Sequence, residues 1–477
     1  MPANNTHHNS TPQLARRLGL FDATMIVMGG IIGSGIFMNP YVVARQVHTS
    51  ALILGAWIAG GLVALAGAFI YAELAAGRSD AGGQYAYLRE AYHPAVAFLY
   101  GWALLLVIQT GGMAAVAVTF ARYFLELTRA PAADWQVAVA ALALLTVINC
   151  LGVRAGGTLQ SVLMVTKILA ILALVACGLA LIPAGATGPG AAQSQFTSQS
   201  QGSFDSITAM GAAMIPVLFA YGGWQTASFV AAEMREPRKT LPRGLLIGVT
   251  GVIALYVAVN FVCVRALGPD GLAATTTPAS SVMRLALGQT GASLIAIGIA
   301  VSTFGFLSQS ILTAPRVYFA MAEHKLFFER VGWLHPRTRV PVVAIALQGA
   351  LAAVIAVSGK YDQILNYVVS VDFIFFGLTA TCVFIFRRRA ARPNALSGKP
   401  ETETDQRTGP GSESYRIPGH PVTTVFFVLA CWLVVINAVY KYPGNTVIGL
   451  VLVLAGIPAY YFWRWWGKRW MKNPVGR

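Results

Sequence analysis

The chain has 477 residues, of which 56% are hydrophobic and only 11% are charged. Soluble domains are about 25% charged, so the composition excludes an ordinary soluble protein. Windows of about 20 apolar residues recur along the chain, which predicts an all-α polytopic membrane protein. The net charge of +16 does not indicate a nucleic-acid partner, because cytoplasmic loops of membrane proteins are enriched in Lys and Arg.

About twelve membrane-spanning helices are expected, each near the length that crosses a bilayer. The segment 183–207 is rich in Gly, Ala, Ser and Gln and lacks Lys and Arg, which predicts a flexible external loop. The segment 388–419 is predicted to be a disordered cytoplasmic linker. The expected spans are 18–44, 51–76, 94–124, 135–152, 158–182, 208–232, 241–267, 291–322, 341–357, 361–387, 420–441 and 445–466.

The distribution of Lys and Arg predicts the orientation. With both ends inside, the inner loops hold most basic residues, including 387–389 and the tail 467–477, and the outer loops hold only scattered ones such as Arg129. We therefore expect a multi-pass protein of the cell (inner or plasma) membrane with both termini cytoplasmic. The polar tail 1–17 lacks a short apolar core followed by a cleavage site, so no signal peptide is expected.

The first span contains Gly29-Gly30-Ile31-Ile32-Gly33-Ser34-Gly35-Ile36-Phe37, in which four of nine residues are glycine. Each glycine costs about 1 kcal/mol relative to alanine in a helix interior, so the helix is expected to break here. Unwound backbone within a bilayer is tolerated only where it is buried in protein or lines a wet cavity. The break is either a ligand site, as in transporters, or a close helix–helix crossing.

The sixth span contains a second break, Phe219-Ala220-Tyr221-Gly222-Gly223-Trp224, preceded by Pro216. Breaks at corresponding positions in two halves are the best sequence indication of an inverted-repeat transporter. The pair favours the ligand-site interpretation over helix packing alone.

Four segments together resemble the amino acid–polyamine–organocation superfamily, closest to its L-type amino-acid transporter branch and the bacterial relatives of that branch. These segments are 33–37 in the first span, 81–92 after the second, 219–224 in the sixth and 233–242 before the seventh. The twelve-span layout fits the family over about residues 15–466.

The resemblance implies a LeuT-like five-plus-five inverted repeat with discontinuous helices 1 and 6. The first repeat would comprise residues 18–182 and the second 208–387, and helices 11 and 12 would follow in 420–466.

The resemblance also implies that an amino acid is held at mid-membrane between the two breaks. The N–H groups of Ser34, Gly35 and Ile36 would bind its carboxylate, and a helix N-terminus does favour an anion. Phe219 matches the family's gating aromatic side chain, and Trp224 is either part of the gate or core packing. The carbonyls expected to accept from the substrate ammonium are those near Gly30, Ile31, Phe219, Ala220 and Gly222.

Lys167 lies inside the fifth span, well away from either end. A charge there is expensive and indicates a functional site, although a lysine can also extend to the interface. In sodium-independent members of the resembled family, a lysine at this position reaches the first-helix break and replaces a sodium ion. Its ammonium is expected to bond carbonyls near Gly29 or Gly30, with the Ser308 hydroxyl as a further partner.

Two acidic residues are candidate proton sites. Asp372 lies in the tenth span, 15 residues before Arg387, which is roughly 22 Å along a helix. It is either a proton-coupling acid or a structural hydrogen-bond acceptor inside the bundle. Glu73, at the inner end of the second span, is expected to help close the cytoplasmic side by charge pairing.

No cofactor and no metal site are expected. The five cysteines have no metal-binding spacing and the histidines are scattered, which disfavours a membrane enzyme. The loop 126–134 lacks the cysteine through which animal members of the resembled family attach a heavy subunit, so no such disulfide-linked partner is expected.

The function expected is sodium-independent secondary transport of amino acids, by exchange or proton coupling. Small and apolar residues near Thr303, Gly305 and Phe306 favour neutral substrates. Gln225 stands where large-neutral transporters often have asparagine, which leaves the selectivity open. The alternatives are a polyamine, amine or cationic amino-acid carrier of the same fold, and an amino-acid sensor that does not transport.

Overall fold

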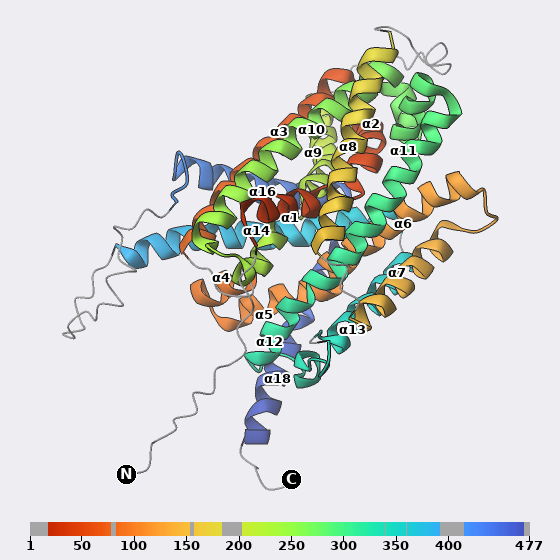
Figure 1. Cartoon of the computed structure of the whole chain (residues 1–477). Helices are drawn as coiled ribbons and strands as arrows, with labels where there is room; N and C mark the ends of the chain where they lie inside the picture. The colour runs from red at the N-terminus through yellow and green to blue at the C-terminus, as the bar shows by residue number, and fades with distance from the viewer. Residues whose placement is uncertain are drawn as a thin grey trace.

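The computed structural model of the chain is a bundle of α-helices (Figure 1). The predicted tail 1–17, most of the loop 183–207, most of the linker 388–419 and the end of the tail 467–477 lie outside the described residues. The structure describes residues 18–77, 83–152, 157–183, 203–338, 340–358, 360–391 and 415–471.

Within these ranges nine helical segments are long and apolar enough to cross a membrane, and three shorter apolar helices accompany them. The shorter ones, Asp134–Cys150, Val165–Leu181 and Val342–Val357, coincide with the predicted fourth, fifth and ninth spans. Together they account for the twelve predicted spans and confirm the polytopic all-α fold.

Helices of the first five spans run from Leu20 to Leu181. The first span is divided into two helices, and the third into two helices joined by one turn of π-helix. The elements are α1 (Leu20–Ile31), α2 (Gly35–Val47), α3 (Ser50–Gly77), the short α4 (Gln84–Ala91), α5 (Pro94–Ala103), η1 (Leu104–Ile108), α6 (Gln109–Thr128), α7 (Asp134–Cys150) and α8 (Gly157–Leu181).

Helices of the remaining seven spans run from Ser203 to Met471. The sixth span continues as a 3₁₀-helix after its break, and the twelfth is divided at Ala455 into two helices. The elements are α9 (Ser203–Tyr221), η2 (Trp224–Glu233), α10 (Pro237–Ala274), α11 (Pro278–Thr313), α12 (Pro315–Glu323), η3 (Glu329–Gly332), α13 (Val342–Ser358), α14 (Tyr361–Ala390), α16 (Val422–Lys441), α17 (Pro443–Leu454) and α18 (Gly456–Met471).

The two broken spans lie at the centre of the bundle. The half-helix α2 packs along α9, and α1 packs against α10, which in turn runs beside α3 (Figure 1). On the other side, α6 packs against α7, α11, α13 and α14. Each broken span is therefore surrounded by intact helices, which can supply the packing that an unwound segment needs within a bilayer.

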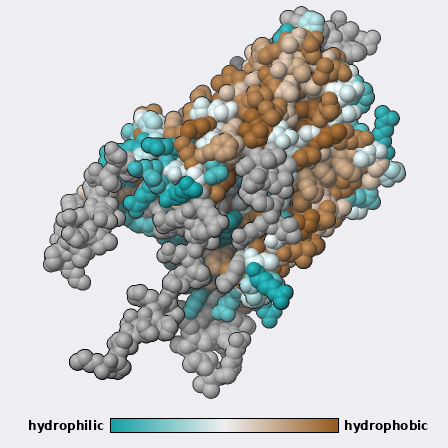
Figure 2. Space-filling view, in the orientation of Figure 1, coloured by the Kyte–Doolittle hydropathy of each residue, from teal (hydrophilic) through white to brown (hydrophobic). Residues whose placement is uncertain are grey.

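Large apolar side chains cover much of the outer surface, as Figure 2 shows for one face. Leu62 of α3, Val354 of α13 and Leu433 of α16 are each more than half exposed. Polar side chains such as Asn260 and Lys167 are instead buried. This reversal of the soluble pattern is expected where lipid, rather than water, surrounds the helices.

The junction between the seventh and eighth spans differs from the prediction. The expected spans 241–267 and 291–322 leave a loop between them, whereas α10 extends to Ala274 and α11 begins at Pro278. Gly268 (φ +67°) and Gly288 (φ +66°) break the helical geometry inside these elements. Because glycine adopts positive φ without steric cost, the chain changes direction at these two points and continues as short helical segments.

Candidate functional site

The first break leaves backbone donors without acceptors. Residues 32–34 are not helical, and the N–H groups of Ile32 and Gly33 donate locally at 2.7 Å each. Among the described residues, no acceptor lies within bonding distance of the N–H groups of Ser34, Gly35 and Ile36. These three donors stand at the N-terminal end of α2, where the helix dipole also favours an anion.

In the second break, the backbone N–H groups are hydrogen-bonded and backbone carbonyls are left without donors. The Gly222 N–H donates to the Phe219 carbonyl at 3.1 Å, and the Gly223 N–H donates to Oε1 of Gln225 at 3.0 Å. In the described part of the chain, the carbonyls of Ala220 and Gly222 accept no hydrogen bond. The end of α9 therefore offers partial negative charge beside the donors of α2.

The carbonyls predicted in the first break have different surroundings. The Ile31 carbonyl accepts from the Tyr256 hydroxyl at 3.0 Å and from the Gly33 N–H. The Gly30 carbonyl lies against the backbone of Gly223. Of the Gly30 and Ile31 carbonyls, therefore, only that of Gly30 accepts no hydrogen bond from the described residues.

The two breaks pack backbone against backbone. A Cβ atom added at Gly223, whose φ is +99°, would lie 2.0 Å from the Gly30 carbonyl oxygen. A Cβ atom added at Gly35 would lie 2.5 Å from Cα of Ala220. Gly35 has no positive φ, so glycine is required there by close approach to α9. The glycines therefore serve both purposes considered above: they allow the two spans to cross closely, and they leave backbone groups free.

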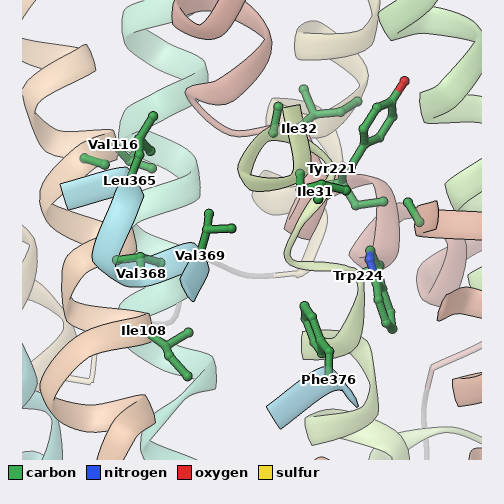
Figure 3. Close-up of a cluster of buried hydrophobic side chains, with 14 of the residues drawn as sticks. Ile31, Ile32, Ile108, Val116, Tyr221, Trp224, Leu365, Val368, Val369 and Phe376 are labelled. Carbon is green, nitrogen blue, oxygen red and sulfur yellow. The ribbon is translucent and has the colours of Figure 1, made fainter. Parts of the chain in front are cut away.

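A cavity of about 100 Å³ lies beside the two breaks. Gly30, Ile31, Ser34, Gly35, Phe219 and Gly222 line it, whereas Ile36 and Ala220 do not contribute to the lining. The wall opposite the breaks comes from the third, eighth and tenth spans, and Figure 3 shows part of both sides. The wall residues are Ile108, Gln109, Gly112, Met113 and Val116, then Phe306, Gln309, Ser310 and Thr313, then Val368, Val369, Asp372 and Phe373.

Lys167 of α8 reaches the first break, as predicted, but at a different carbonyl. Its Nζ donates to the Ile32 carbonyl at 2.6 Å and lies 5.7 Å from the centroid of the Phe306 ring. Its side chain is buried, so it does not extend to a membrane surface. Among the described residues, Lys167 makes none of the expected hydrogen bonds to Gly29, Gly30 or Ser308. The backbone of Ile32 has a ψ of 81°, so it is the Ile32 carbonyl that points away from the helix and meets the lysine.

Trp224 lies in an aromatic cluster rather than in the cavity wall. Its indole stacks on Phe376 at a centroid distance of 5.2 Å and meets Tyr71 edge-on at 4.7 Å (Figure 3). Phe373, which does line the cavity, meets Phe376 edge-on at 5.4 Å. The cluster therefore begins at the cavity wall and continues toward the end of α14 that holds Arg387.

Glu73 also lies outside the cavity. Its two carboxylate oxygens accept from Nε and Nη2 of Arg387 at 2.8 and 2.6 Å, and the Ile417 N–H donates to it at 2.7 Å. This ion pair, called the inner ion pair after the side on which the Lys and Arg distribution predicts it to lie, joins α3, α14 and the segment before α16. The charge pairing expected of Glu73 is thus present, with its carboxylate committed to a bidentate contact.

A second polar network, called the outer polar network after the side on which it is predicted to lie, is found near the opposite end of α14. The Tyr361 hydroxyl donates to Oδ1 of Asn39 at 2.8 Å, and the Asn39 amide donates to the Pro216 carbonyl. Nearby, Arg122 pairs with Asp134 at 3.0 Å. These contacts tie α2 to the tenth and sixth spans and α6 to α7.

Several of these residues were not predicted from the sequence. The roles of Gln109, Gln309 and Tyr256 could not be predicted, because a polar side chain inside a span can serve either packing or ligand binding. Their position inside a span is itself a signal, since polar residues within a span usually face the bundle interior. The π-helical turn η1, which ends immediately before Gln109, has no local sequence signature that we recognise.

Comparison with known proteins agrees with this geometry. A family model described as "Amino acid permease" matches residues 18–458. The serine/threonine exchanger SteT of Bacillus subtilis (strain 168) is 30% identical over 460 residues, which cover 95% of this chain and 98% of the exchanger.

Two human proteins are similar over nearly the same length. Large neutral amino acids transporter small subunit 2 is 28% identical over 463 residues, covering 95% of this chain and 81% of that protein. The cystine/glutamate transporter is 26% identical over 467 residues, covering 96% and 88%. The resemblance found in the sequence motifs is thereby confirmed, and the chain belongs to the amino acid permease family as a membrane-spanning transporter of amino acids, not an enzyme.

Proposed function

We propose that the chain is a sodium-independent secondary transporter that works by alternating access. The observation that supports this most directly is the pairing of free donors in one break with free acceptors in the other. A zwitterionic amino acid presents one carboxylate and one ammonium, and the N–H groups of Ser34 and Gly35 with the carbonyl of Gly222, all from residues that line the cavity, complement both. Phe219, in the cavity wall, would cover the bound substrate.

Lys167 supports the independence from sodium. Its Nζ already donates to the Ile32 carbonyl, so the backbone oxygen that a sodium ion would seek at this break is occupied by the lysine side chain. A second cation beside it would be repelled in a low-dielectric environment.

Neutral amino acids are the substrates we propose. The cavity lining is mostly apolar, and its uncharged polar side chains are those of Ser34, Gln109, Gln225, Thr226, Gln309, Ser310 and Thr313. Neither Lys nor Arg is among the residues that line it, which disfavours an acidic side chain. The likeness to a serine/threonine exchanger points the same way.

The repeat boundaries and the membrane orientation belong to the same proposal. Two five-helix repeats, 18–182 and 208–387, would rock around the fixed site while helices 11 and 12 stay outside it. Both termini would be cytoplasmic, as the Lys and Arg distribution indicates. No disulfide-linked heavy subunit is proposed, since the loop between α6 and α7 has no cysteine.

The test is uptake of radiolabelled amino acids by purified protein in liposomes, with external sodium replaced by choline. We expect saturable uptake of at least one neutral amino acid and an unchanged rate in choline. A steep dependence on sodium would contradict the role given to Lys167. Binding without uptake would instead support an amino-acid sensor.

A second candidate function is favoured by one observation. Asp372 lines the cavity, and a carboxylate there would suit the side chain of a cationic amino acid or the second amine of a polyamine. Competition by L-lysine, L-arginine and putrescine in the same assay separates this candidate from the neutral one.

A further inference from the structure

Asp372 is the only ionisable side chain among the described residues that line the cavity. It projects from the middle of α14, between the wall residues Val368, Val369 and Phe373. It is partly exposed, and the space it faces is the cavity itself. The scheme proposed above for neutral amino acids gives this carboxylate no role.

No hydrogen bond or ion pair to Asp372 is found in the described part of the chain. The titratable groups that interact with it electrostatically are Tyr71 of α3, Tyr100 of α5 and Cys431 of α16, none of which is a cation. The buried cation of this region, Lys167, donates to the Ile32 carbonyl of the first break. The Asp372 carboxylate therefore lacks a protein counter-charge.

An ionised carboxylate without a counter-charge is costly inside a membrane protein. The cost falls when the group binds a cation, and a neutral amino acid has none to spare. Its ammonium is already assigned to the carbonyls of the broken helices, and its side chain is uncharged. A proton is the remaining cation that can reach the cavity together with such a substrate.

We propose that Asp372 binds one proton with each neutral amino acid, so that transport is coupled to the proton gradient. This rests on the proposed function and specifies its coupling ion. The proton would come from water on the outer side, bond to a carboxylate oxygen of Asp372, and leave to water on the cytoplasmic side. An O–H bond of hydronium on the outer side breaks as the carboxyl O–H bond forms, and that bond breaks again as the proton returns to water on the cytoplasmic side.

The position of Asp372 suits a proton that must enter from one side and leave on the other. One turn further along α14, Phe376 stacks on Trp224 in the aromatic cluster. Beyond the cluster, Arg387 of the same helix joins the inner ion pair. When the outer polar network opens, the carboxylate would face outer water through the cavity. When the cluster and the inner ion pair separate, it would face cytoplasmic water.

The experiment compares the wild type with Asp372→Asn in sealed proteoliposomes. The probe is whichever neutral amino acid the wild type binds most tightly by calorimetry. In the wild type, an inward proton gradient should drive accumulation above the outside concentration. Asp372→Asn should lose this accumulation and keep exchange of labelled for unlabelled substrate. The wild-type uptake rate should change by up to about tenfold per pH unit, and the variant by less than about twofold.

The control variant is Asp362→Asn, an acidic residue in the first turn of the same helix and outside the cavity lining. It should keep gradient-driven accumulation. A second measurement does not depend on any variant. Calorimetry of the wild type at alkaline pH, where Asp372 is ionised before substrate binds, should show uptake of about one proton per substrate bound when buffers of different ionisation enthalpy are compared.

Three results would overturn the proposal. The first is accumulation by Asp372→Asn driven by the proton gradient. The second is a wild type that exchanges substrate but binds no proton with it. The third is a variant that loses L-lysine or L-arginine binding alone, because Asp372 would then recognise a side-chain cation. If no amino acid bound to the wild type, the proposed function itself would fail, which is a different outcome from any of these three.

Discussion

The two helix breaks reach the same cavity by opposite means. In the first break three consecutive N–H groups have no acceptor among the residues that the structure describes, and a lysine from another span bonds the Ile32 carbonyl. In the second the N–H groups of Gly222 and Gly223 are satisfied within the break, and carbonyls are left free. A glycine pair therefore does not by itself determine which charge a break attracts. The direction of each half-helix and its local side-chain partners determine it.

The contact between the breaks can be tested at Gly35. Gly35→Val would place side-chain atoms inside the backbone of Ala220, since even a Cβ atom would lie 2.5 Å from its Cα. We expect no detectable amino-acid binding by calorimetry. The control is Gly55→Val in α3, where a Cβ atom meets nothing within 4 Å. Retained affinity in a folded Gly35→Val protein would mean that the breaks only pack together and that the site lies elsewhere.

The separate roles of the two breaks in binding the substrate can be tested by modifying the substrate. If the first break holds the carboxylate and the second the ammonium, the amide, decarboxylated and N-acetyl forms of a substrate should all compete poorly. Each modification leaves buried polar groups unpaired, which can cost about 10⁴-fold in discrimination. Removing a methylene from the side chain should cost far less. A decarboxylated amine that competes as well as the parent would remove the carboxylate from the first break and indicate an amine carrier.

The lysine that distinguishes the first break is the next point to test. Lys167→Ala would leave the Ile32 carbonyl buried without its charged donor, a loss of about 1.5–3 kcal/mol, or roughly 10- to 100-fold in transport rate. Lys360→Ala, an exposed lysine before α14, is the control and should transport normally. Uptake at normal rates by Lys167→Ala, with the protein present in the membrane at wild-type level, would show that the first break needs no cation.

The smallest effect is expected in the second break. Gln225→Ala removes the acceptor of the Gly223 N–H, which should cost about 1 kcal/mol, or roughly fivefold in substrate affinity. Gln225→Glu keeps an acceptor oxygen and should restore most of that affinity. If both variants bind as the wild type does, the glycine conformation alone fixes the second break.

Much of the fold follows from the sequence because apolar length is a strong signal in membrane proteins. The twelve spans and both glycine breaks were predictable from that signal and from local composition. The close contact of Gly30 with Gly223, and of Gly35 with Ala220, was not, because it depends on how two spans cross. The partner of Lys167 was predicted only to within a few residues, since the ψ angle of Ile32 decides which carbonyl turns outward. The wall residues Gln109 and Gln309 could be placed only once the faces of the third and eighth spans were known.

The π-helical turn η1 has a consequence for the history of the third span. A π-helical turn contains one residue more than the α-helical turn it replaces. Deleting one residue within Leu104–Ile108 would therefore restore regular α-helix while α5 and α6 kept their own contacts. Elsewhere in a span, a single deletion would turn every following side chain by about 100°. This segment is thus a place where evolution could insert or remove one residue and reshape the wall beside Gln109 without redesigning the bundle.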